Sequence, residues 1–526
     1  MEESKTGFIP KPNKTPGLAT SYRPICMLDT LGKLHERLIG NRLLEEIKNA
    51  GDLSDRQFGF REGRSTIMAA EGVLKLAQEE RRKSLKTRRL VAAITSDVRN
   101  AFNAVSRWDI IEELKNRKVS SYMINLIQSY FTNREFVAHS GKWYDSNAGV
   151  PQGSVLGPIL WNILYDGILR VRMPTGTQLI AFADDLVLVA AGKEEGELMR
   201  KANQALEGVC EWMEGKNLRI AAEKTEAILL TGRKKHRDVY FIVEGTRIHT
   251  QETIKYLGIT LDKHMSFGKH VEKTAAKATK AAGALARIMP RVGGAGEPVR
   301  KTLAAVAESI MLYAAPVWAE ALEKKKYRQV AERVQRKMAI RICRGYRTIS
   351  TAALQVLARQ MPIDLATKER KRAYIGEKKN KTEVREETLQ IWQERWQKET
   401  ATAQWTRRLI RDIKAWYGRT QLTNYQLTQF LSGHGCFKAY ICAIGKELSS
   451  DCEYCRELDT AEHTVFNCVR WTAGREGVNR KIGRRIGPEN VVELMLETPE
   501  NWQAIQAYIT KTMKAKEGEE RERQGK

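Results

Sequence analysis

With 526 residues, the chain is long enough for about three domains of ~150 residues each, and its core needs no disulfide staples. The 89 lysines and arginines exceed the 63 aspartates and glutamates, and the resulting charge of +26 favours a polyanionic partner, because neutralised phosphates release their counterions. A membrane protein is disfavoured, since the most apolar long segment (residues 303–322) contains Glu308 and Glu320 and is predicted to be a buried helix.

The first stretch of the chain is irregular. Residues 8–14 look like a strand end that enters a turn, which we interpret as a fragment that starts inside a longer protein. No charged and then apolar signal peptide is present, so we expect an intracellular protein. An amphipathic helix is predicted over residues 31–48, from the near-helical spacing of Leu34, Leu38, Leu43 and Ile47.

Three basic residues stand beside prolines on these irregular segments, namely Lys11, Lys14 and Arg23. Each is compatible with a solvated loop residue. The alternative is a set of clamps for a triphosphate, because arginine can bind phosphate oxygens in a bidentate manner.

A carboxylate follows the next buried strand. A helix over residues 67–83, capped by Ser65 or Thr66, precedes the apolar strand 90–94. Asp97 follows at the C-terminal end of this strand, where it can face a cleft. Taken alone, it is also compatible with a helix cap.

Residues 149–158 contain three glycines and two prolines, which predicts a tight loop whose backbone can approach a ligand. The loop leads into a predicted helix over residues 159–170, and a helix N-terminus favours anions. The sequence is neither a Walker A loop nor a dinucleotide-binding loop, and a plain turn is the alternative.

Two adjacent carboxylates, Asp184 and Asp185, stand between two apolar runs in residues 180–189. Asp-Asp is common in hairpin turns. It is costly next to buried strands, however, because like charges repel and burial disfavours both ions. A hard divalent cation would offset this cost, and Asp97 supplies a third carboxylate, so we favour a metal site.

The remaining elements of this region complete one sheet. We predict a helix over residues 193–215, a strand over 226–230 that Lys224 precedes, and a strand and turn over 256–261. The alternation of strands and helices over residues 90–262 indicates an α+β layer with its helices on one face.

Beyond residue 263 the composition changes to alanine, lysine and arginine with helical spacing, which predicts a helical domain with basic residues outward. One apolar stripe consists of Ala304, Ala307, Met311 and Ala315. Trp392 and Trp396 lie four residues apart, which is more typical of a packing face than of a base-stacking platform. The charged tail from Lys514 is expected to be disordered.

Five of the eight cysteines crowd into one C-terminal segment, which favours a metal over disulfides. Two thiolates three residues apart, followed by an imidazole and a further thiolate, suit tetrahedral zinc. The favoured ligands are Cys452, Cys455, His463 and Cys468. Another set of four stays open, because His434, Cys436 and Cys442 are close in sequence. The scattered Cys26, Cys210 and Cys343 are interpreted as reduced core residues.

Taken together, these segments resemble a reverse transcriptase of the non-LTR retrotransposon kind, particularly the insect elements with a Cys-Cys-His-Cys segment after the polymerase. The match runs in order through Ile9-Pro10-Lys11-Pro12, Ser21-Tyr22-Arg23-Pro24-Ile25, Asp97-Val98-x-x-Ala101-Phe102, Gly149-x-Pro151-Gln152-Gly153-Ser154-x-x-Gly157-Pro158, Phe182-Ala183-Asp184-Asp185, Asn217-Leu218 with Lys224-Thr225, and Tyr256-Leu257-Gly258. The resemblance implies an α+β, right-hand polymerase with a helical thumb and a small zinc module. The implied domains are fingers and palm (1–262), thumb (263–345), helical connector (346–430), zinc- and nucleic-acid-binding segment (431–475), and C-terminal helix with charged tail (476–526).

The resemblance also implies the chemistry of the site. Asp97 and Asp184 would bridge two Mg²⁺ ions, with the Val98 carbonyl as a further ligand and Asp185 at the edge of the site. Lys224 would donate a proton to pyrophosphate. One Zn²⁺ would occupy the C-terminal segment.

The nucleotide would be held from the fingers side. Lys11 and Arg23 are implied to hold the triphosphate, Phe102 to block a ribose 2′-hydroxyl, and Gln152 and Gly153 to line the nucleotide and template pocket. The implied partners are an RNA template, a DNA primer or target DNA, and deoxynucleoside triphosphates, with no membrane. We expect the protein to act in the nucleus on target DNA and to form a cytoplasmic particle with RNA.

The chain departs from the family in three respects. The upstream endonuclease of such elements is not part of this sequence, no ribonuclease H triad is recognisable, and no carboxylate constellation supports endonuclease activity. The gap between the second cysteine and the histidine is longer than in the retroviral knuckle, so nucleic-acid binding is carried over but the knuckle fold is not. Two alternatives stay open: a catalytically inactive nucleic-acid-binding remnant, and a structural zinc protein.

Overall fold

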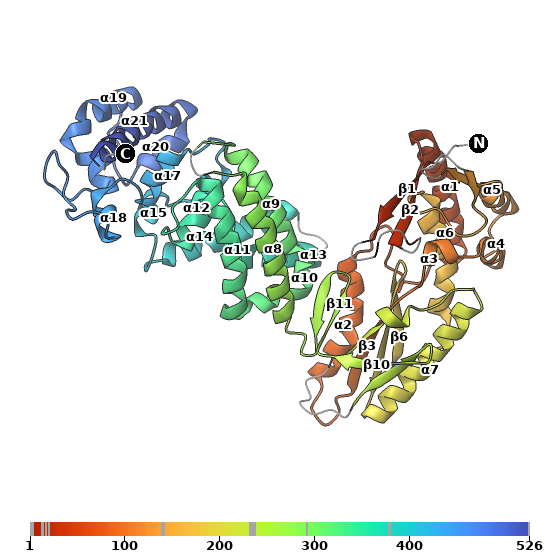
Figure 1. Cartoon of the computed structure of the whole chain (residues 1–526). Helices are drawn as coiled ribbons and strands as arrows, with labels where there is room; N and C mark the ends of the chain where they lie inside the picture. The colour runs from red at the N-terminus through yellow and green to blue at the C-terminus, as the bar shows by residue number, and fades with distance from the viewer. Residues whose placement is uncertain are drawn as a thin grey trace. The chain divides into compact units, whose positions relative to one another are not determined.

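The computed structural model describes residues 5–11, 15, 18, 21–137, 143–230, 238–290, 293–376 and 380–523. The chain divides into two compact units, Met1–Phe267 and Gly268–Lys526. The first unit combines sheets and helices, and the second is mainly helical (Figure 1). The predicted α+β fold with a helical C-terminal region is confirmed.

A six-stranded sheet forms the centre of the first unit, with the strand order β6-β7-β3-β8-β10-β9. The apolar runs recognised in the sequence form the middle strands of this sheet. These strands are buried on both faces, and apolar side chains such as valine and leucine therefore point to each face. The strands are β3 (Leu90–Asp97), β6 (Thr177–Phe182), β7 (Asp185–Gly192), β8 (Glu226–Leu229), β9 (Tyr240–Val243) and β10 (Thr246–Gln251). A hairpin of β11 (Thr253–Tyr256) and β12 (Ile259–Asp262) follows.

Helices cover both faces of this sheet. The helices that follow β3 in the sequence contribute to one hydrophobic core on a single face of the sheet, in agreement with the predicted α+β layer. They are α3 (Ala101–Ala104), α4 (Arg107–Asn116), α5 (Ser121–Phe131), α6 (Leu156–Tyr165) and α7 (Glu195–Glu214). Helix α2 (Thr66–Arg82) comes from upstream and packs on β3 and β6, with Gly72 beside Ile180 (Figure 1). Its N-cap is Ser65, whose side chain accepts a hydrogen bond from the Met68 amide.

A second sheet with the order β2-β1-β4-β5 belongs to the same unit. Its strands are β1 (Lys5–Pro10), β2 (Tyr22–Met27), β4 (Glu135–Val137) and β5 (Trp143–Asp145). Helix α1 (Thr30–Asn49) follows β2, but the predicted buried face is partly wrong. Leu34 and Leu38 are exposed, and Ile39, Leu43 and Ile47 are buried, because the core contacts the adjacent helical stripe.

The segment after Asp97 forms two separate helices, α3 and α4, and Trp108 at the start of α4 is exposed. The helix predicted over residues 159–170 begins earlier, as α6, and ends in the 3-10 turn Asp166–Arg170.

The second unit begins with three long helices, α8 (Gly268–Arg287), α9 (Glu297–Leu312) and α11 (Lys325–Cys343), which pack on one another. The predicted alanine-rich stripe is buried, although Ala315 belongs to the next helix, α10 (Ala315–Trp318). Among the described residues, no single helix is long and apolar enough to cross a bilayer. The bent pair Glu297–Leu312 and Ala315–Glu323 passes that test by length and composition alone.

Further helices continue the second unit: α12 (Thr351–Leu357), α13 (Ile363–Ile375), α14 (Lys381–Lys398), α15 (Gln404–Leu409), α16 (Ile413–Gly418), α17 (Tyr425–Ser432), α18 (Lys438–Ala443), α19 (Thr472–Ile482), α20 (Val491–Glu497) and α21 (Pro499–Arg523). Trp392 and Trp396 are buried packing residues, as predicted. The expectation of a disordered tail from Lys514 is wrong for the described residues, because α21 continues to Arg523 and buries Met513.

Candidate active site

Three carboxylates that are distant in sequence converge at one end of the central sheet. β3 ends at Asp97 and β7 begins at Asp185, and these two residues are direct partners in the antiparallel register. Asp184 belongs to the two-residue turn between β6 and β7. The sheet therefore brings together the three acids that the sequence singled out.

The environment of Asp184 and Asp185 disfavours the charged forms of their carboxylates. Burial raises the pKa of Asp184, and the charge of Asp97 adds to this effect. Burial, followed by the charges of Asp184 and Asp97, raises the pKa of Asp185 to about 6. A bound cation would therefore stabilise this cluster of carboxylates. Carboxylate oxygens are also the ligands that Mg²⁺ prefers.

The backbone next to Asp97 brings Lys224 to the same place. The Ala221 amide donates to the Asp97 carbonyl (2.8 Å) and the Arg99 amide donates to the Arg219 carbonyl (2.8 Å). The Lys224 ammonium then lies 2.5 Å from an Asp97 carboxylate oxygen.

Val98 forms an isolated bridge with Ile220. The two hydrogen bonds of this bridge are made by Asp97 and Arg99, the residues on either side of Val98. The Val98 carbonyl oxygen therefore takes part in neither of them. That oxygen is directed away from the bridge, as a metal ligand at this position would require.

Phe102 and the glycine-rich loop form the next layer of the site. The Phe102 ring stacks on Trp161, with ring centroids 5.3 Å apart, and is half-buried. Its carbonyl accepts a hydrogen bond from the Val150 amide (2.8 Å), which joins the strand-end segment to the loop that carries Gln152 and Gly153.

The predicted anion site at the start of the following helix is filled by the protein itself. One carboxylate oxygen of Glu36, a residue of α1, accepts hydrogen bonds from the Val155 amide (2.6 Å) and the Leu156 amide (3.0 Å). Glu36 is buried. The expectation that this N-terminus is available to a ligand anion is therefore wrong, because an internal carboxylate satisfies these amides.

The same loop is held to β2. The Cys26 amide donates to the Gln152 carbonyl (2.7 Å). Gly153 has φ +100°, and a Cβ at this position would lie 2.6 Å from the Cys26 carbonyl oxygen. Glycine is required here by both backbone conformation and space.

Two of the predicted phosphate clamps lie on the β1–β2 hairpin. Arg23 pairs with Ile9 in the register of β1 and β2, and the Lys11 amide donates to the Ser21 carbonyl (2.7 Å). The positive charge of Arg23 acts against the burial that raises the pKa of Asp184, so the guanidinium is electrostatically coupled to the carboxylates. The third clamp, Lys14, lies outside the described residues.

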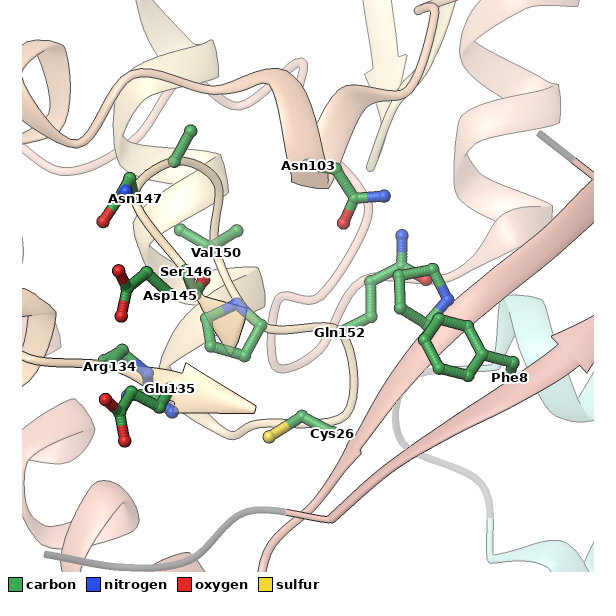
Figure 2. Close-up of a pocket in the computed structure, with 13 residues that line it drawn as sticks. Phe8, Cys26, Asn103, Arg134, Glu135, Asp145, Ser146, Asn147, Val150 and Gln152 are labelled. Carbon is green, nitrogen blue, oxygen red and sulfur yellow. The ribbon is translucent and has the colours of Figure 1, made fainter. Parts of the chain in front are cut away.

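A pocket of about 330 Å³ opens between this hairpin and the glycine-rich loop. Figure 2 shows Phe8, Asn103 and Gln152 on one side of it, and Glu135 and Asp145 on the other. Amides and an aromatic ring thus line one side of the pocket and two carboxylates line the other, with Arg134 also in its lining.

A separate cluster of possible metal ligands lies in the second unit. One ligand atom from each of Cys452, Cys455, His463 and Cys468 lies within 4.8 Å of the others. The Cys455 sulfur is 3.1 Å from His463 Nε2, and His463 Nδ1 is 2.9 Å from a Glu457 carboxylate oxygen. A carboxylate on the second ring nitrogen orients a histidine ligand.

The alternative zinc ligands do not join this cluster. The Cys436 sulfur contacts the Met513 carbonyl (4.0 Å), the Cys442 sulfur contacts the Leu448 carbonyl (3.9 Å), and His434 Nδ1 contacts the Ser432 carbonyl (2.7 Å). Among the described residues, the favoured set of four is the one that the fold brings together.

Comparisons with known proteins agree with this description. Residues 9–261 match the family described as reverse transcriptase (RNA-dependent DNA polymerase). The chain is 28% identical to the putative 115 kDa protein in type-1 retrotransposable element R1DM of Drosophila melanogaster, over 94% of this chain and 50% of that protein. It is 31% identical to the probable RNA-directed DNA polymerase from transposon BS of the same species, over 51% of this chain and 30% of that protein.

Among solved structures, apo telomerase from Candida tropicalis aligns with 10% identity and a TM-score of 0.38, over 73% of this chain and 68% of that chain. This chain spans half the length or less of the two Drosophila relatives named above.

Proposed function

We propose that residues 9–261, which match the reverse transcriptase family, form a reverse transcriptase domain of the kind found in type-1, non-LTR retrotransposons. On this basis we propose that the protein is an RNA-directed DNA polymerase that copies element RNA into DNA from a 3′-hydroxyl of target DNA. The observation that carries the proposal is the convergence of Asp97, Asp184 and Asp185 at one end of the sheet.

The residues present fit two Mg²⁺ ions, because three carboxylates stand together and burial disfavours the charged forms of two of them, Asp184 and Asp185. We propose that Asp97 and Asp184 bridge both ions, with the Val98 carbonyl as a further ligand and Asp185 at the edge. When bound, the ions would activate the primer hydroxyl and stabilise the departing pyrophosphate. Lys224 forms an ion pair with Asp97, and we propose that it donates a proton to pyrophosphate.

The fingers side of the site would hold the nucleotide. Arg23 is coupled to Asp184 and would bind the triphosphate together with Lys11. Phe102, fixed by its stacking on Trp161, would exclude a ribose 2′-hydroxyl by steric contact.

We propose that the pocket of Figure 2 receives a nucleobase. Its volume is in the range of small-ligand sites, and its amides can read base edges while Phe8 and Pro24 supply apolar contact. Glu135 and Asp145 disfavour a phosphate there, since like charges repel.

In the second unit we propose one structural Zn²⁺ on Cys452, Cys455, His463 and Cys468. Its donor set is that of a closed tetrahedral site, with His463 oriented by Glu457. The segment around it is proposed to bind nucleic acid, in line with the positive charge of the chain.

The test is extension of a DNA primer on an RNA template with Mg²⁺. The wild-type chain is expected to extend the primer, and Asp184→Ala is expected to abolish extension. Asp238→Asn serves as the control, because this side chain is 74% exposed and pairs only with His249 in the described structure. A silent wild-type chain that still binds the template–primer would instead identify an inactive nucleic-acid-binding remnant.

A further inference from the structure

The turn that carries Asp184 has a costly backbone conformation. Ala183, the first of its two residues, has φ +58°, which is unfavourable for a residue with a Cβ. Such a conformation persists only where the surroundings enforce it. The contacts that enforce it here come from residues 56–59, more than 120 positions upstream, together with α6.

Residues 56–59 lie along β6 as a short strap. The Phe58 amide donates to the Ala181 carbonyl (2.8 Å), and the Ala181 amide donates to the Arg56 carbonyl (2.9 Å). Gln57 is the parallel bridge partner of Ala181. The strap therefore ends directly beside the turn.

The Gln57 side chain reaches the turn itself. It is fully buried, and its Oε1 accepts hydrogen bonds from the Ala183 amide (3.2 Å) and the Gly59 amide (2.9 Å). A single side-chain oxygen thus joins the strap to the residue that precedes Asp184.

Two further contacts fix the same residue. The Trp161 indole N–H donates to the Ala183 carbonyl (3.2 Å), so side chains bind both backbone polar groups of Ala183. The Asn162 side-chain amide donates to the Gly59 carbonyl (2.8 Å). Gly59 lies so close that a Cβ there would be 2.1 Å from the Ala183 nitrogen.

We infer that Gln57 and Gly59 are positioning residues for polymerisation: they hold the strained turn so that Asp184 stays beside Asp97. The inference rests on the proposed function. Gln57 is fully buried, and both residues act through the backbone of Ala183. Without the Gln57 acceptor, the Ala183 amide is free to leave the strained conformation, and Asp184 moves with it.

The test compares Gln57→Met with Gln335→Met. Gln335 is a matched control in the second unit, because it is also buried and its Oε1 also accepts two N–H groups, from Gln355 and Ile363. Gln57→Met is expected to lower kcat by about a hundredfold, the usual consequence of misplacing a catalytic group by about 1 Å. It should also raise the Mg²⁺ concentration for half-maximal extension, whereas Gln335→Met should change neither.

A readout independent of activity is amide hydrogen exchange over residues 180–188 in the metal-free protein. Gln57→Met is expected to accelerate exchange there at least tenfold, because the Ala183 amide loses its acceptor, with exchange in residues 90–96 unchanged. If Gln57→Met does not fold, Gly59→Ala takes its place, with Gly196→Ala as control, since a Cβ at Gly196 meets no neighbour within 4 Å.

The inference would be overturned if both strap variants, Gln57→Met and Gly59→Ala, kept the wild-type rate of hydrogen exchange, the wild-type kcat and the wild-type Mg²⁺ requirement. That result is distinct from failure of the proposed function, in which the wild-type chain itself does not extend a primer.

Discussion

Replacement of Glu36 should affect a loop that is 116 or more residues away in sequence. The Glu36 carboxylate is buried and accepts two backbone N–H groups at the start of α6, directly after Gln152 and Gly153. Hydrogen bonds to a charged acceptor contribute roughly 1.5–3 kcal/mol each. The Leu156 amide is buried, but water can reach Val155 once the carboxylate is gone.

We therefore expect Glu36→Ala to lower the free energy of unfolding by about 2–4 kcal/mol. The hydrogen bond from the Leu156 amide is lost in full, whereas water partly replaces the one from the Val155 amide. Glu36→Gln keeps an acceptor and loses only the charge at the helix N-terminus, which contributes about 1 kcal/mol. Because the helix start also anchors the loop, Glu36→Ala should raise KM for the nucleotide more than it lowers kcat.

Urea unfolding and steady-state primer extension measure these quantities. Glu45→Ala is the control, because Glu45 is an exposed residue of the same helix. A Glu36→Ala protein with the stability of Glu45→Ala and an unchanged KM would refute the reasoning.

Three further predictions concern other parts of the chain. Gly153→Ala should raise KM for the nucleotide at least tenfold, because the φ of +100° and the nearby Cys26 carbonyl leave no room for a Cβ. Steady-state primer extension measures this KM, and an unchanged value would contradict the prediction. Chelation of zinc, or Cys455→Ser, should accelerate hydrogen exchange in α21, because Tyr508 in this helix donates a hydrogen bond to the Val465 carbonyl, close to the proposed ligand His463. Unchanged exchange in α21 would speak against a zinc-dependent contact. Burial lowers the pKa of His270 to about 4, so the unfolded state binds more protons at this residue between pH 6.5 and 4, and His270 alone should lower stability by about 2 kcal/mol from pH 7 to pH 5. In urea unfolding over this range, the wild type should therefore lose about 2 kcal/mol more than His270→Gln, and equal losses would contradict this prediction.

The sequence was informative where function depends on local patterns. Apolar runs on both sides of Asp184 and Asp185, and a third run before Asp97, predicted the strands that now carry these acids. The Cys/His cluster was recognisable for the same reason, because thiolates and an imidazole at short spacing leave few alternative roles.

Long-range contacts were not visible in those patterns. Glu36 looked like any polar residue of an amphipathic helix, since its hydrogen-bond partners are 119 and 120 positions downstream. Gln57 carries no local signal of a role, because the turn that it binds is 126 positions away. Helical spacing alone also allowed two faces of α1, and only the packed core selects the one with Ile39.

The charged tail was misjudged for a related reason. Composition alone suggested that residues from Lys514 would be disordered. Lys516 instead forms a 2.6 Å ion pair with Asp459, a buried carboxylate in the zinc segment. A non-local partner thus anchors a helix whose charged composition alone suggested disorder.

The most direct test of the account is the affinity of the protein for Mn²⁺, used in place of Mg²⁺ and measured by calorimetry without nucleic acid. Asp97→Asn and Asp184→Asn should each weaken the same binding event at least tenfold, because both carboxylates serve one cation site. Wild-type affinity in Asp97→Asn, with a loss confined to Asp184→Asn, would show that the two acids do not share an ion and would contradict the central claim.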